Sequence, residues 1–95
     1  MSKFSRVPLD EYTTILGQET AKLGQYDVLH QVWSWDGVTA ESYIFCNDDV
    51  AEMDDDEIKH IVAQSPRVKS ENDNINLTRS DSGYTFVNFN ANLSD

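Results

Sequence analysis

The sequence predicts an α+β domain, a two-layer sandwich in which two helices cover an antiparallel four-stranded sheet built from two hairpins, in the order α-β-β-α-β-β. Two stretches with apolar residues at helical spacing predict the helices, at 8–23 and 48–64. Two turn signals, Asp36-Gly37 and Asp81-Ser82-Gly83, predict the hairpins. With 95 residues, the chain is expected to form a single acidic domain over residues 1–95.

The first predicted helix runs from Pro8 to Leu23. Proline suits the first helical turn, where its missing N–H is not needed. Gly24 is the expected C-terminal stop, because glycine readily adopts the left-handed conformation that ends many helices. Apolar side chains recur at helical spacing between these ends, at Leu9, Tyr12, Leu16 and Leu23.

Strands are predicted at 26–35 and 38–46, joined by Asp36-Gly37, a pair typical of a type I′ hairpin. This turn sets the register and places Leu29 opposite Ile44. The face that carries this pair is expected to be the core, and its other members are Trp33, Trp35, Val38 and Ala40. The opposite face is expected to be half covered or partner-facing, and it carries Val28, His30, Val32, Glu41, Tyr43 and Phe45.

The second predicted helix covers 48–64 and ends at Ser65-Pro66. Asp54 and Glu57 also fit a capping box, so a start at Asp54 is an alternative. Ile75 and Leu77 indicate a short third strand. The fourth strand is predicted from Tyr84 to Leu93, with Thr85, Val87, Phe89, Ala91 and Leu93 on one face.

Charge is distributed very unevenly along the chain. The net charge is −10, yet no lysine or arginine occurs between Leu23 and Ile58. The acids in this stretch are Asp27, Asp36, Glu41, Asp48, Asp49, Glu52, Asp54, Asp55, Asp56 and Glu57. Outside it, seven acids balance all seven bases, so the net charge belongs to one contiguous third of the protein. Such a surface disfavours direct binding of nucleic acid or anionic membranes and favours basic partners.

Catalytic and metal-binding patterns are weak, and the sequence predicts no enzyme, no cofactor and no metal site. The four glycines are scattered and form no phosphate-binding loop. The single cysteine, Cys46, could in principle meet His30 or His60 as a thiol–imidazole pair, but a packed structural cysteine is the plainer interpretation. The acidic run lacks the glycine and the ligand offsets of a calcium loop, which leaves at most weak cation binding.

Helix capping and favourable dipole charges explain one or two of the acids, but they do not explain the whole run. We therefore expect a small acidic inhibitor that binds the basic nucleic-acid-binding surface of a nuclease or effector complex by DNA mimicry. Anti-CRISPR and anti-restriction proteins of phages are examples of this physical type. The expected partner-binding residues are Asp36, Glu41, Tyr43, Asp48, Asp49, Glu52, Asp54, Asp55, Asp56 and Glu57. Tyr26 and Trp33 are further candidate aromatic anchors.

Two alternatives use the same sequence features. One is an immunity protein or antitoxin that neutralises a nuclease toxin through the same acidic surface. The other is a non-catalytic accessory or adaptor domain whose acidity serves solubility. The single cysteine and the absence of a signal peptide or long apolar run favour a cytoplasmic location without membrane association.

Overall fold

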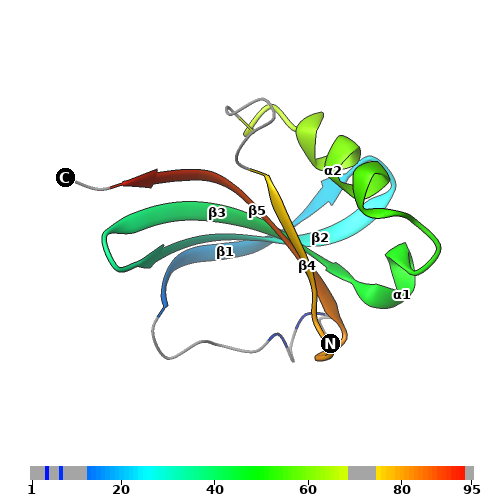
Figure 1. Cartoon of the computed structure of the whole chain (residues 1–95), viewed down its shortest axis with the longest axis horizontal. Coiled ribbons are helices and arrows are strands. Elements are labelled where there is room, and N and C mark those ends of the chain that lie inside the picture. The colour runs from blue at the N-terminus through cyan, green and yellow to red at the C-terminus, as the bar shows by residue number, and fades with distance from the viewer. Residues whose placement is uncertain (1–3, 5–6, 8–12, 69–74, 94–95) are drawn as a thin grey trace.

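The computed structural model describes residues 4, 7, 13–68 and 75–93, with only the backbone considered at 90–93. Its elements are β1 (Thr14–Leu23), β2 (Tyr26–Trp35), β3 (Val38–Cys46), α1 (Asn47–Val50), α2 (Asp55–Ala63), β4 (Asn76–Arg79) and β5 (Tyr84–Leu93). One five-stranded sheet has the order β1-β2-β3-β5-β4, and all neighbouring strands are antiparallel (Figure 1). The prediction of a four-stranded sheet with the order α-β-β-α-β-β is therefore wrong.

The error lies at the N-terminal side, where the segment predicted as a helix forms β1 over its described part. The residues 8–12 of that prediction lie outside the described residues. Leu23 pairs with Tyr26, and Gly24 at φ +60° occupies the first central position of the two-residue turn between them. This is the position that a type II′ hairpin reserves for glycine. The positive φ expected at Gly24 is present, but it closes a hairpin instead of a helix.

The hairpin of β2 and β3 confirms the prediction made from its turn. Asp36 and Gly37 have φ angles of +46° and +80°, as a type I′ turn requires. The register pairs Trp35 with Val38 and Leu29 with Ile44, as expected.

The connection from β3 to β4 is a crossover that carries both helices. Since β3 and β4 both run antiparallel to β5, they are parallel to each other, and such strands need a long connection. The predicted single helix is two short ones. Asp54 caps α2, because its side chain accepts a hydrogen bond from the Glu57 backbone N–H at 2.9 Å. The alternative start at Asp54 is thus the correct one for the longer helix.

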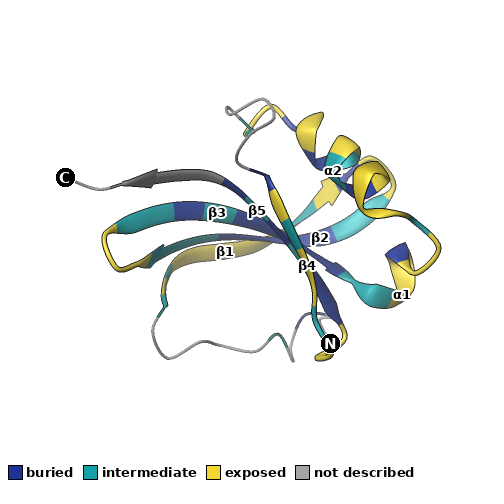
Figure 2. Ribbon diagram, viewed as in Figure 1, coloured by how far each residue is buried: buried dark blue, intermediate teal, exposed yellow. Residues whose placement is uncertain are grey.

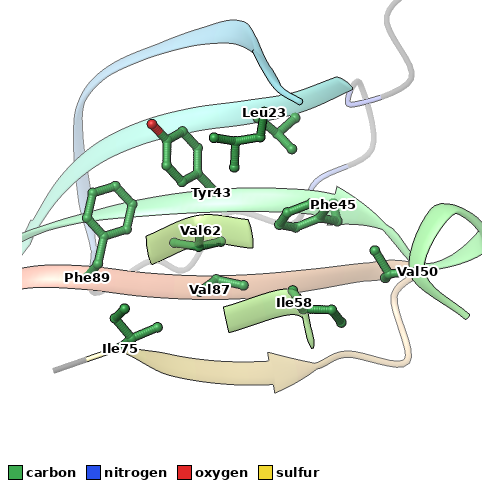
Figure 3. Packing of buried hydrophobic residues seen from close by; sticks show 10 residues of the cluster. Leu23, Tyr43, Phe45, Val50, Ile58, Val62, Ile75, Val87 and Phe89 are labelled. Atoms are coloured by element: carbon green, nitrogen blue, oxygen red, sulfur yellow. The ribbon is translucent and has the colours of Figure 1, made fainter. Parts of the chain in front are cut away.

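The helices cover the face of the sheet that was expected to be the minor one. The larger core cluster lies beneath them and contains Leu23, Val28, Tyr43, Phe45, Val50, Ile58, Val62, Ile75, Val87 and Phe89 (Figure 3). The opposite face holds a smaller cluster around Leu29 and Ile44, with Phe4 and Tyr84. Trp35 lies on that face, which was predicted to be the main core, yet it is 48% exposed. The predicted assignment of the two faces was therefore wrong.

Candidate partner-binding surface

Seven of the ten predicted partner-binding residues lie together in the segment 48–57, which we call the acidic segment. It comprises α1, the turn after it and the first turn of α2. All seven side chains are exposed, namely Asp48, Asp49, Glu52, Asp54, Asp55, Asp56 and Glu57 (Figure 2). These seven carboxylates therefore reach solvent from adjacent turns of the chain.

Buried apolar residues and Arg79 connect the acidic segment to the sheet. Val50 of α1 and Ile58 of α2 are both fully buried in the larger cluster. Arg79 of β4 donates from Nε to Asp55 Oδ1 at 3.0 Å, from Nη1 to the Val50 carbonyl at 3.2 Å, and from Nη2 to the Met53 carbonyl. These bonds satisfy carbonyl groups between the two helices and connect the turn that carries the acids to β4.

Local physics explains part of this acidity. Asp54 is the N-cap of α2, and Asp55, Asp56 and Glu57 occupy its first turn, where negative charge is favourable. Asp48 and Asp49 stand in α1, which is only four residues long, so a helix dipole offers them little. The structural role therefore accounts for the α2 acids better than for those of α1 and the turn.

Asp36 is separated from the acidic segment. It is exposed in the β2–β3 turn, whereas α1 begins directly after the other end of β3 (Figure 1). The nine residues of β3 rise about 3.3 Å each, so these ends are roughly 26 Å apart. The ten acids therefore do not form a single band.

Glu41 and Tyr43 are built into the interior. The Glu41 atom Oε1 lies 2.7 Å from His30 Nε2 and 2.8 Å from Arg67 Nη2, and the Glu41 side chain is 17% exposed. Tyr43 is 4% exposed, stacks on Phe89 at 4.9 Å between ring centroids, and its hydroxyl lies 2.7 Å from Ser65 Oγ. Both side chains thus connect the sheet to the residues after α2, and we leave them out of the candidate surface.

Replacing Glu41 with glutamine should lower the free energy of unfolding by about 1–2 kcal/mol. The change leaves His30 and Arg67 without their carboxylate, and the cost stays below that of a fully buried pair because Arg67 is half exposed. Urea unfolding measures it, with Glu19→Gln on the exposed surface of β1 as the matched control, expected to change stability by less than about 0.5 kcal/mol. Equal stabilities of the two variants would contradict the structural role of Glu41.

Three bases from outside the acidic third reach back to its carboxylates, which the sequence did not indicate. Arg79 pairs with Asp55, Arg67 with Glu41, and Lys22 Nζ lies 2.7 Å from Asp27 Oδ1. The Lys22 pair joins two strands next to each other in the chain, and the hairpin register could have indicated it. The partners of Arg67 and Arg79 depend on the crossover, for which the sequence carries no signal.

The aromatic candidates and Cys46 occupy different environments. Tyr26 is half buried beside α1, while Trp33 lies on the opposite face and donates from Nε1 to Ser42 Oγ at 2.7 Å. Cys46 packs with the smaller cluster on that same face. His30 and α2, which carries His60, lie on the helix-covered side, so the sheet separates the thiol from both imidazoles.

Two functional features are absent from the described parts of the chain. In residues 4, 7, 13–68 and 75–93, no group of three or more histidine, cysteine, aspartate or glutamate side chains is arranged to hold a metal ion. Within the same ranges, no helix has the length and apolar character needed to cross a membrane.

Comparisons with known proteins give no family assignment. No protein-family model, no curated protein and no solved structure matches the chain.

Proposed function

We propose that this protein is a small acidic inhibitor that binds the basic nucleic-acid-binding surface of a target protein, with carboxylates of the acidic segment in place of phosphates. The observation that carries the proposal is the concentration of seven exposed carboxylates in residues 48–57 on a support held by Arg79. Fixed charges lose little conformational freedom on binding, so they favour association more than the same charges on a mobile tail.

The spacing of the charges supports mimicry of a nucleic-acid strand. Three consecutive residues are acidic in the first turn of α2, and successive residues of a helix rise about 1.5 Å along its axis. A DNA strand presents one phosphate per about 3.4 Å of its own axis, which is of the same order. A groove lined with lysine and arginine would therefore meet a comparable density of negative charge on the acidic segment.

An unbalanced acidic surface also has a cost that a function would explain. Like charges at this density repel one another and oppose the compact state. Arg79 pairs with Asp55, and the segment carries six further exposed carboxylates that add to a concentrated negative field. Such a field accelerates encounter with a positive partner.

Capture from a nuclease-treated lysate of the source organism tests the proposal. We expect the immobilised protein to retain a basic nucleic-acid-handling protein at about 0.1 M salt and to release it at about 1 M, where the Debye length falls from about 10 Å to about 3 Å. A bound protein that is indifferent to salt would contradict charge mimicry. Recovery of one nuclease toxin would assign the same surface an immunity role.

A further inference from the structure

A shallow pocket of about 260 Å³ lies directly beside the acidic segment. It is lined by Gln25 of the β1–β2 turn, by Tyr26 and Asp27 of β2, and by Asp49 of α1. Two separate parts of the chain, residues 25–27 and Asp49, therefore meet around one depression, and each contributes one carboxylate.

Tyr26 lines the pocket, and its ring also packs against the larger core cluster. Its ring contacts Phe45 edge to face, with the centroids 6.2 Å apart and the planes at 67°. Phe45 is fully buried, and Tyr26 itself is only half buried. A preorganised ring that is partly open to solvent is a suitable surface for stacking a flat cationic group.

Asp27 already forms an ion pair with a side chain of this protein, Lys22. Its Oδ1 accepts from Lys22 Nζ at 2.7 Å, although the side chains of Lys22 and Asp27 are 68% and 48% exposed. An ion pair that is so open to water is worth little and exchanges readily. A cationic group that also contacts Tyr26 and Asp49 would have more partners there than the Lys22 ammonium has.

We propose that this pocket binds one arginine side chain of the protein's partner, with the guanidinium stacked on Tyr26 and hydrogen-bonded to the Asp27 and Asp49 carboxylates. Arginine suits the site better than lysine, because its planar guanidinium combines ring stacking with several directed hydrogen bonds. The inference rests on the proposed function, in which the partner presents a basic surface, and it identifies the side chain that the partner contributes. A single side chain in an open pocket binds weakly, with a Kd on the order of millimolar.

Nuclear magnetic resonance titration with N-acetyl-arginine amide tests the pocket without knowledge of the partner. We expect saturable shifts of the backbone amides of Gln25, Tyr26, Asp27 and Asp49, and of the Tyr26 ring protons. N-acetyl-citrulline amide, which has a similar shape but no charge, should bind at least about tenfold more weakly. N-acetyl-lysine amide should also bind more weakly, and equal binding of arginine and lysine probes would overturn the assignment to arginine.

Matched variants separate this site from general acidity. Asp27→Asn with Asp49→Asn should abolish saturable binding of the arginine probe, and Tyr26→Leu should weaken it at unchanged charge. Asp36→Asn with Asp81→Asn removes the same charge at exposed turns outside the pocket and should leave binding unaltered. The amide spectrum of each variant reports whether it is folded.

Several outcomes would overturn the inference. Shifts that rise linearly and spread over all exposed carboxylates would show that the probe senses only the overall charge. Binding that survives both pocket variants would place the guanidinium elsewhere. Saturable binding of Mg²⁺ or Ca²⁺ at the same amides, with none of the arginine probe, would replace arginine by a metal cation. If the pocket does not bind the arginine probe, but neutralisation at positions 48, 52 and 56 still lowers the affinity for the captured partner, this inference is lost and the proposed function stands.

Discussion

Replacing Phe45 with alanine should lower the free energy of unfolding by about 3–5 kcal/mol, the range typical of a deleted core aromatic ring. Phe45 is fully buried in the larger cluster, beneath α1 and α2. Its removal would leave a cavity between the sheet and the helices and would also remove the ring that supports Tyr26. Urea unfolding followed by far-ultraviolet circular dichroism measures the effect.

Trp33→Ala is the informative comparison, because Trp33 lies on the other face of the sheet. It is half buried and makes one side-chain hydrogen bond to Ser42, so its loss should cost only about 1–2 kcal/mol. A larger cost for Trp33 than for Phe45 would contradict the placement of the main core under the helices.

The apolar side chains on both faces of the hairpin of β2 and β3 explain why the sequence predicted the wrong core face. Leu29 and Ile44 on one face, and Val28 and Phe45 on the other, give both faces of the hairpin an apolar character. Alternation then identifies a strand but not the side that is covered. The covered side is set by where α1 and α2 return over the sheet, and no local feature of β2 or β3 carries that information.

Turn chemistry was informative to different degrees at Asp36-Gly37 and at Gly24. Asp36-Gly37 leads to few structures other than a tight hairpin, and both its geometry and its register were predicted. A lone Gly24 after a segment with helical spacing fits both a helix end and a type II′ turn. The segment is a strand because it pairs with β2 over nearly all of its length. Local propensity does not describe such an interaction between two segments.

The candidate surface was predicted in part. The acids at 48–57 are consecutive in the chain, so any compact conformation keeps them close, and the structure exposes all seven. Glu41 and Tyr43 alternate with apolar residues on a central strand, and whether such positions face solvent depends on the covering layer. Asp36 lies one strand length away along β3, so closeness in sequence to the acidic run did not bring it into the same surface.

Neutralising three acids of the acidic segment should weaken binding of the captured partner by about tenfold to a hundredfold. The variant Asp48→Asn, Glu52→Gln, Asp56→Asn retains the cap at Asp54 and the Asp55–Arg79 pair, so the fold should be intact. Three charge contacts of about 0.5–1 kcal/mol each give this range of affinity. The salt dependence of the affinity should also become shallower, since fewer charges are screened.

The matched control is Glu19→Gln, Asp36→Asn, Asp81→Asn, which removes three negative charges from exposed positions outside the acidic segment. Asparagine suits position 36, because it tolerates the positive φ of a type I′ turn. Both triple variants therefore carry the same reduction from a net charge of −10. A difference in affinity between the two variants therefore depends on where the charges lie and not on how many were removed.

The most direct test of the acidic segment as the binding surface is titration calorimetry of the captured partner against the wild-type protein and both triple variants at one salt concentration. We expect a loss of affinity of about tenfold or more for the variant at 48, 52 and 56, and a loss of less than about threefold for the variant at 19, 36 and 81. Equal losses in the two variants would mean that the partner responds to total charge alone. Unchanged affinity in the first variant would place the binding surface elsewhere on the protein.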